Sequence, residues 1–269
     1  MPVFHALVLG LVQGLTEFFP ISSSGHLILV PALLGWKDQG VAFDTVLHLG
    51  TLTALLWFFW KDLWALALAV FKKDVAGTAA RRFIGQCVVA SLPILVVGYF
   101  LGGLLEATNR VPWVVASSLL FWGALLFLAD HVSAVKPEER GWETVSWKHA
   151  LLVGFVQPIA LIPGTSRSGI TITAGLLSGL SREVAARFSF FVSIPVTAVA
   201  GFYGLSKIFG SSTSAEPAPS AIALLIGFVT AAIVGGWAIR FLISYVSKKH
   251  YDVFVVYRLA LAIVVLLLV

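Results

Sequence analysis

A short polar stretch at residues 163 to 171 contains the residue types that bind phosphate oxygens. It places Arg167 among hydroxyl-bearing residues and glycines, between two long apolar runs. The guanidinium of Arg167 stays protonated, and its planar fork of donors suits phosphate oxygens. Small hydroxyls, and backbone N–H groups at the start of a following helix, would add further donors. The stretch therefore predicts an oxyanion site, in which Arg167 is catalytic and the substrate is bound by Gly164, Thr165, Ser166, Ser168, Gly169 and Thr171.

A second polar break, at residues 13 to 26, supplies groups that complement this arginine. Gln13 and Glu17 are four residues apart, so both project from the same face of a helix. Glu17 could bind a metal ion, act as a general base, or form a structural ion pair with Arg167. Glu17 is therefore a candidate catalytic residue and metal ligand, and Gln13 a candidate substrate-binding residue.

The turn that follows Glu17 carries three serines and a histidine, namely Ser22, Ser23, Ser24 and His26. His26 could donate a proton, attack as a nucleophile, or only form hydrogen bonds at the start of a helix. Each serine is a weak signal, because serine is a common helix cap. Ser22, Ser23, Ser24 and His26 are therefore candidate site residues, and the residues alone leave their separate roles open. Asp44 and His48, four apart on the next predicted helix, are weaker candidates for the rim of the site or for a metal site.

Composition indicates that the chain is an integral membrane protein. Of the 269 residues, 59% are hydrophobic and 12% are charged, and the mean hydropathy is +0.96. A soluble domain would need more polar surface, so we expect one polytopic membrane domain over residues 1–269. The single cysteine, Cys87, excludes an intrachain disulfide or a thiolate cluster. The net charge of +5 does not indicate nucleic-acid binding, because basic residues of a membrane protein mainly set its orientation.

A membrane setting sharpens the interpretation of both polar breaks. Arg167 could face lipid headgroups from a cytoplasmic loop, but ionisable residues within membrane segments are usually functional. Irregular backbone at membrane depth needs protein or water around it, so each break predicts a re-entrant helix hairpin that lines a cavity. The long apolar runs predict six spans, at residues 41–60, 82–105, 111–130, 184–206, 220–245 and 253–269.

The second half of the chain repeats the first. Residues 150–157 resemble residues 6–13 at an offset of 144, and the same offset pairs Ser22 with Ser166 and Gly25 with Gly169. We therefore predict repeat one at 1–130 and repeat two at 150–269, joined by a polar loop at 131–149. Each repeat would be a re-entrant hairpin plus three transmembrane helices, and an odd number of crossings inverts the second repeat.

The basic residues give this topology an orientation. On one side lie twelve of them: Lys61, Lys72, Lys73, Arg81, Arg82, Lys136, Arg140, Lys148, Arg182, Arg187, Lys248 and Lys249. On the other side lie Lys37, Arg110 and Lys207. The positive-inside rule makes the first side cytoplasmic. Without re-entrant hairpins the chain would make eight plain spans, and the repeats would run parallel.

Three segments resemble the undecaprenyl-diphosphate phosphatase family of the BacA type. They are LVQGLTEFFPISSSGHL at 11–27, PGTSRSGIT at 163–171, and the segment from Ser181 to Pro195. The resemblance implies a multi-pass enzyme of the bacterial inner membrane. It would release phosphate from undecaprenyl diphosphate, recycle the lipid carrier for cell-wall synthesis, and affect bacitracin sensitivity.

The resemblance also implies roles for particular residues. The family's serine and histidine correspond to Ser23 and His26, which we therefore expect to be catalytic, with Ser22 and Ser24 beside them as substrate-binding residues. The family's phosphate-binding segment corresponds to Ser166, Arg167, Ser168 and Thr171. A divalent cation, Mg²⁺ or Ca²⁺, is implied as a cofactor. The family's acidic motif begins with Glu or Gln; here that position is Gln13, which leaves Glu17 as its carboxylate.

Two other classes of protein compete with an enzyme. Inverted repeats with broken helices are also typical of a secondary transporter or lipid flippase. A structural scaffold is the third class. The dense group of Ser, Arg, Glu and His residues favours phosphoanhydride hydrolysis, with a polyprenyl diphosphate lipid as substrate. A homodimer is a further expectation for this chain.

Overall fold

The structure is a computed structural model that describes residues 1–109, 111–133, 141–210 and 220–268. These residues form eleven α-helices and two short 3₁₀ helices, and they contain no strand. Five helices are long and apolar enough to cross a membrane: α3 (Gly40–Phe58), α5 (Val75–Asn109, with the span at Val75–Gly102), α6 (Pro112–Val132), α9 (Arg182–Gly210, with the span at Arg182–Ser206) and α10 (Ala221–Val246). The predicted all-α, polytopic membrane class is therefore confirmed. The sixth predicted span corresponds to α11 (Asp252–Leu268), an apolar helix of 17 residues.

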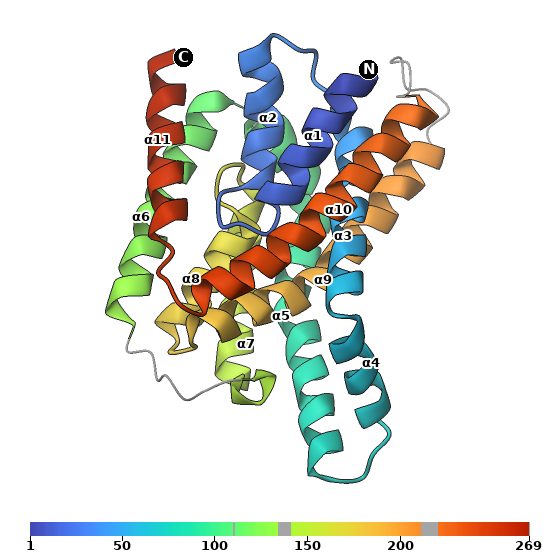
Figure 1. Cartoon of the computed structure of the whole chain (residues 1–269), viewed down its shortest axis with the longest axis vertical. Helices are drawn as coiled ribbons and strands as arrows, with labels where there is room; N and C mark the ends of the chain where they lie inside the picture. The colour runs from blue at the N-terminus through green and yellow to red at the C-terminus, as the bar shows by residue number, and fades with distance from the viewer. Residues whose placement is uncertain (110, 134–140, 211–219, 269) are drawn as a thin grey trace.

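The remaining helices are shorter. They are α1 (Val3–Thr16), α2 (Ser23–Leu34), α4 (Trp60–Ala69), α7 (Trp147–Val156) and α8 (Arg167–Leu177), with 3₁₀ helices η1 (Trp142–Thr144) and η2 (Gln157–Leu161). Helix α4 was not predicted, because residues 61–81 are polar at both ends. It forms a hairpin with the start of α5 that projects from one end of the molecule (Figure 1). Part of the predicted polar loop 131–149, residues 134–140, lies outside the described residues.

Both predicted breaks separate a pair of short helices. The first lies between α1 and α2, where Pro20 has no N–H for a helical hydrogen bond. The second lies between η2 and α8, where Gly164 has a φ of +90°. Ser22 is the last residue of the first turn and Ser166 is the last residue of the second. Both have positive φ values, of 76° and 73°. Each caps the helix that follows by accepting a hydrogen bond from a glycine N–H three residues later.

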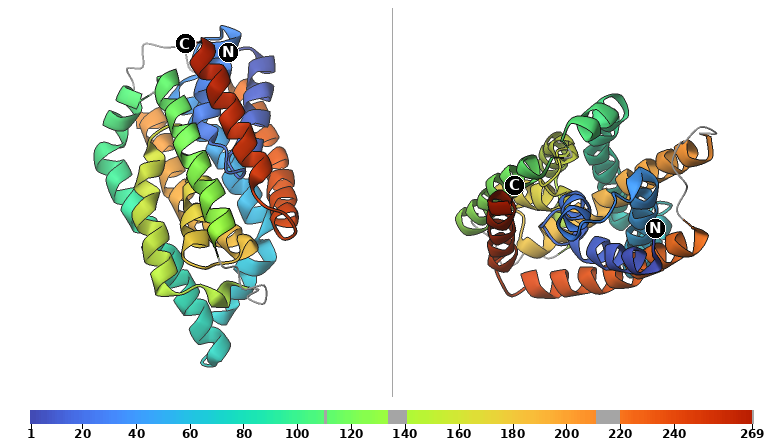
Figure 2. Two further views of the ribbon diagram at one scale, coloured as in Figure 1. Left: turned by 90° about the vertical axis from the view of Figure 1, so that its left-hand side faces the viewer. Right: turned by 90° about the horizontal axis from the view of Figure 1, so that it is seen from above.

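The two short-helix pairs lie toward opposite ends of the molecule and meet in its middle. Figures 1 and 2 show α1 and α2 near the end where both termini lie, and α7 toward the other end. The turns touch directly, since the Ser168 hydroxyl donates to the Phe19 carbonyl at 3.1 Å. This junction brings the two predicted polar breaks together.

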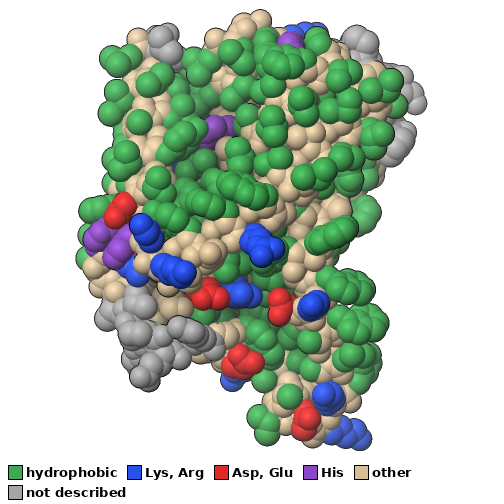
Figure 3. All heavy atoms as spheres, viewed as in Figure 1, with side chains coloured by type: hydrophobic (Ala, Val, Ile, Leu, Met, Phe, Trp, Pro, Cys, Tyr) green, Lys and Arg blue, Asp and Glu red, His purple; other side chains and the backbone are tan. Residues whose placement is uncertain are grey.

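Close backbone packing holds α1 at this junction. A Cβ on Gly10 would lie 2.8 Å from the Gly227 carbonyl oxygen of α10, and one on Gly14 would lie 2.9 Å from the Gly235 nitrogen. Small residues that let helix backbones approach are typical of membrane helix interfaces. On the face drawn in Figure 3, charged side chains gather in the lower half and hydrophobic ones cover the upper half.

Candidate active site

The site begins at the C-terminal end of α1, where Glu17 is buried. One carboxylate oxygen, Oε2, accepts hydrogen bonds from the Gln13 amide at 3.1 Å and from the Ser23 hydroxyl at 2.6 Å. Gln13 reaches it because both residues lie on one face of α1, and Ser23 because the turn folds the start of α2 back over α1. A carboxylate that accepts a hydroxyl hydrogen bond at this distance is placed to take the hydroxyl proton.

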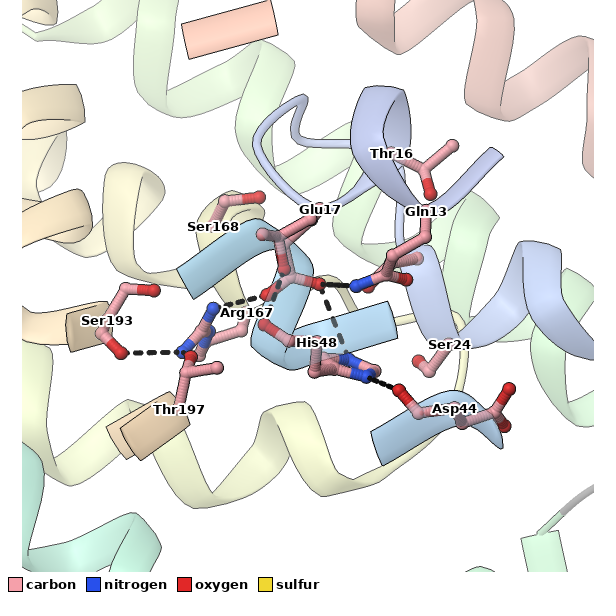
Figure 4. A network of polar contacts seen from close by, with 12 residues as sticks. Gln13, Thr16, Glu17, Ser24, Asp44, His48, Arg167, Ser168, Ser193 and Thr197 are labelled. Carbon is pink, nitrogen blue, oxygen red and sulfur yellow. Dashed lines mark hydrogen bonds and ion pairs between the residues drawn. The ribbon is translucent and has the colours of Figure 1, made fainter. Parts of the chain in front are cut away.

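Arg167 is the first residue of α8 and forms an ion pair with Oε1 of Glu17. Its other terminal nitrogen donates to the Thr197 hydroxyl at 2.9 Å and to the Ser193 carbonyl at 3.4 Å, both on α9 (Figure 4). The Arg167 side chain is 17% exposed, whereas that of Glu17 is 6% exposed. The ion pair therefore joins the two polar breaks, which are 150 residues apart in sequence, and Arg167 is the more exposed of its two partners.

The hydroxyls of Ser166, Ser168 and Thr171 form hydrogen bonds with other groups of the protein, whereas that of Thr165 does not. Ser166 caps α8 and lies 3.2 Å from the Ser168 hydroxyl, while the Thr171 hydroxyl lies 2.6 Å from that of Ser189. The Thr165 hydroxyl is buried and has no hydrogen-bond partner. Gly164 is required by space as well as by its positive φ, because a Cβ there would lie 2.4 Å from the Val115 carbonyl oxygen. These residues shape the start of α8 around Arg167.

The two histidines of this region lie in different surroundings. His26 is buried, and its ring nitrogens contact the Ser22 carbonyl and the Tyr257 hydroxyl, each at 2.7 Å. That is the hydrogen-bonded arrangement at a helix start, and none of these contacts goes to Glu17. His48, a weaker candidate from the sequence, lies with Nε2 3.5 Å from Oε2 of Glu17. Its Nδ1 contacts the carbonyl of Asp44 at 2.7 Å. Of the first-turn serines, Ser24 is exposed and lies 3.4 Å from the Ser22 hydroxyl.

Comparison with known proteins supplies the family. The sequence model of the family "Bacitracin resistance protein BacA" matches residues 6–264. The chain belongs to the BacA family. It is 43% identical to the undecaprenyl-diphosphatase of Chlorobium phaeovibrioides and 42% identical to that of Pelotomaculum thermopropionicum. In both cases the match covers 100% of this chain and 97% of the relative. Undecaprenyl-diphosphatase 2 of Stutzerimonas stutzeri is 42% identical over 100% of this chain and 98% of its own length.

The donor set around Glu17 suits the divalent cation expected for this BacA-family chain. The side-chain oxygen of Gln13, Oε1, is buried and has no hydrogen-bond partner. Together with the Glu17 carboxylate and the Ser23 hydroxyl it offers the hard oxygen ligands that Mg²⁺ and Ca²⁺ prefer. The residues therefore fit a cation, which would share Glu17 with Arg167.

A second group that could hold a metal lies at the end of α6 and the start of α11. Asp130, His131 and His250 offer ligand atoms that lie within 4.8 Å of one another. Arg182 forms an ion pair with Asp130 and contacts His250 Nδ1 at 2.8 Å. The backbone N–H of Tyr251 also donates to Asp130, at 2.8 Å. A guanidinium among the ligands opposes a cation, so we interpret this group as an ion-pair cluster at the helix ends.

Sequence reasoning missed two parts of the site of this BacA-family chain. Ser193 and Thr197, which hold Arg167, lie in an apolar helix, and only the fold shows that they face it. Arg258 is fully buried in α11 and contacts both turns. An arginine inside an apolar run was the signal that could have identified it.

Proposed function

We propose that this chain is a membrane phosphatase that hydrolyses undecaprenyl diphosphate to undecaprenyl phosphate and inorganic phosphate. The observation that carries the proposal is the contact of Ser23, Glu17 and Arg167 at the junction of the two turns, in a chain whose relatives are named undecaprenyl-diphosphatase. A nucleophile, a base and a phosphate-binding guanidinium are the groups that this hydrolysis needs. The transporter or flippase alternative has no support in the comparisons.

In the proposed reaction Ser23 attacks the terminal phosphorus of the lipid diphosphate. The Ser23 oxygen forms a bond to phosphorus, its proton passes to Glu17, and the bond to the bridging oxygen breaks, so that undecaprenyl phosphate leaves. Water then hydrolyses the phosphoserine, releases inorganic phosphate and restores the serine. The 2.6 Å hydrogen bond from Ser23 to Glu17 supports this assignment of nucleophile and base.

Arg167 would bind the oxygens of the transferred phosphoryl group. In the substrate-free protein its charge is balanced by Glu17, which avoids leaving either charge buried and unpaired. Substrate oxygens would take the place of that contact, while Thr197 and Ser193 keep the guanidinium oriented. Glu17 and Gln13 would hold the divalent cation, whose charge would balance that of the diphosphate when it is bound.

The lipid tail would lie along an aromatic surface beside the first turn. The ring of Phe19 lies 5.1 to 6.5 Å, centroid to centroid, from those of Trp237, Phe241 and Phe254 on α10 and α11. Trp237 and Phe241 are exposed on the outside of the helices. Since Phe19 follows Glu17 by two residues, a diphosphate at the site would place its isoprenoid chain next to these rings.

The fold that we propose is one membrane domain, 1–269, in the bacterial inner membrane, with six spans, two re-entrant hairpins and inverted repeats. Three observations support it. Ser22 and Ser166 share their backbone conformation and capping at the offset of 144. The short pairs α1–α2 and α7–α8 lie toward opposite ends, and α11 lies at the position of the sixth predicted span. We also propose that the protein forms a homodimer. Light scattering of the purified protein in detergent would test this by measuring its mass.

Phosphate release by the purified protein tests the function. Undecaprenyl diphosphate in detergent with Mg²⁺ should yield inorganic phosphate, and a chelator should lower the rate. Glu17→Gln should reduce the rate by at least about 100-fold, the scale of losing a general base, while Asp62→Asn on α4 serves as the matched control. The proposal fails if folded protein releases no phosphate, or if Glu17→Gln is as active as the control.

A further inference from the structure

Arg258 makes an unusual set of contacts for a charged residue at membrane depth. Its side chain is fully buried in α11, and it donates hydrogen bonds to five backbone carbonyls. Two of these, Ser118 and Leu119, belong to α6, at 3.4 and 3.2 Å. The others belong to the two turns. They are Pro20 in the first turn, at 2.9 Å, and Gly164 and Thr165 in the second, at 3.0 and 3.1 Å.

The surrounding backbone leaves room for this guanidinium. A Cβ on Gly169 would lie 3.1 Å from one of its terminal nitrogens, and a Cβ on Gly123 would lie 3.4 Å from Nε. Among the ion pairs formed by the described residues, none involves Arg258. A cation buried without a carboxylate is costly unless its donors are satisfied, and here the carbonyls of both turns satisfy them.

The contacted carbonyls lie next to the groups that do the chemistry. Pro20 stands three residues after Glu17 and three before Ser23, while Thr165 comes two residues before Arg167. One guanidinium thus holds the turn that carries the nucleophile and base against the turn that carries the phosphate-binding arginine. The ion pair between Glu17 and Arg167 cannot by itself keep the two turns at a constant distance during turnover, because the substrate must displace it.

We propose that Arg258 is a positioning residue that holds the two turns of the site in register. It does not touch the substrate; it keeps Ser23 and Glu17 at the distance from Arg167 that phosphoryl transfer requires. Lysine would not replace it, because an ammonium group lacks the planar fork that reaches carbonyls on both sides. The effect on turnover rests on the proposed function, whereas the effect on the distance between the turns does not.

Spin-label distances test the clamp without any substrate. Labels at Leu34→Cys on α2 and Leu177→Cys on α8, in a Cys87→Ala background, report how the two short helices sit relative to each other. Both leucines are exposed and lie at the far ends of their helices from the turns. We expect Arg258→Lys and Arg258→Gln to widen or shift the distance distribution in detergent. Gly123→Val, which crowds the guanidinium from α6, should have the same effect, and the exposed Arg240→Lys on α10 should have none.

Steady-state kinetics connects the clamp to the reaction. Arg258→Lys should lower kcat by about 100-fold, as expected for a displaced reacting group, and change KM by less than about threefold. A merely structural role would reduce the yield of folded protein but leave kcat per folded molecule unchanged. Unchanged distances in all three variants would overturn the proposal, and so would an altered distance with unchanged kcat. If the unmodified protein released no phosphate, the proposed function would fail, and the distances would still decide whether the clamp exists.

Discussion

Glu17 accepts contacts from side chains on four different helices. They are Gln13 on α1, Ser23 on α2, His48 on α3 and Arg167 on α8. Such a carboxylate can serve as a base only while its neighbours keep it ionised and oriented, and Arg167 is the permanently charged one among them. The chemistry of the site therefore depends on whether Arg167 and Ser23 have the separate roles assigned to them.

The role of Arg167 can be tested by a substitution that keeps the positive charge but removes the planar guanidinium group. Arg167→Lys loses the fork that could bind two phosphate oxygens while Thr197 holds it in place. We expect turnover to fall by about two orders of magnitude, on the scale of losing one preorganised donor. The rate should be measured in detergent at saturating substrate and Mg²⁺, with Arg240→Lys as control. Full activity would show that a point charge is sufficient.

Ser23 poses a different question, because its hydroxyl could attack phosphorus or only orient water. If Ser23 is the nucleophile, Ser23→Ala should leave almost no phosphate release, and added cation should not restore it. The unmodified protein, quenched in acid during turnover, should contain phosphoserine that mass spectrometry locates at residue 23. Ser247→Ala, an exposed serine at the end of α10, is the control. A residual rate of about one per cent in Ser23→Ala, with no phosphoserine, would instead assign the hydroxyl to orienting water.

At the scale of elements, the site depends on where helices stop. Ser22 and Ser166 cap α2 and α8 in the same unusual backbone conformation, so in each turn the next residue, Ser23 or Arg167, begins a helix at the junction. The breaks could be predicted, because polar residues with proline and glycine inside apolar runs cannot continue a lipid-facing helix. Helix α4 was not predicted, because the stretch 61–81 that contains most of it begins and ends with charged residues.

Gly164 gives a test of the second turn. Gly164→Ala would force a Cβ to within 2.4 Å of the Val115 carbonyl oxygen at a φ of +90°, so the turn must move away from α6. We expect a lower Tm and a fall in kcat of at least about tenfold, because Arg167 follows three residues later. Gly236→Ala on α10 is the matched control, since a Cβ there meets nothing within 4 Å. Equal behaviour of the two variants would mean that the turn tolerates displacement.

At the scale of the whole molecule, the offset of 144 relates Ser22 to Ser166, and these two residues have nearly the same φ in the structure. Contacts between elements that the repeat does not relate could not be predicted from the sequence. Tyr257 binds His26 from 231 residues away, and Arg258 reaches Pro20 from 238 residues away. Those contacts depend on how α11 packs, which no local pattern encodes. The sequence therefore indicated the Glu17 and Arg167 pairing but gave no reason to prefer His48 over His26 beside the carboxylate.

The inverted arrangement has its own test, since re-entrant hairpins and plain spans place the N-terminus differently. In the proposed topology, Pro2 and Lys37 lie on the same outer side, because α1 and α2 enter and leave through one face of the membrane. Single cysteines at Pro2, Lys37, Lys72 and Lys248, all exposed positions, can be labelled in a Cys87→Ala background. A membrane-impermeant maleimide should label the first two in intact spheroplasts, and the last two only after lysis.

Eight plain spans would put Pro2 and Lys37 on opposite sides. Labelling of only one of that pair from outside would therefore contradict the inverted repeat, and with it the reason that the two turns meet from opposite faces.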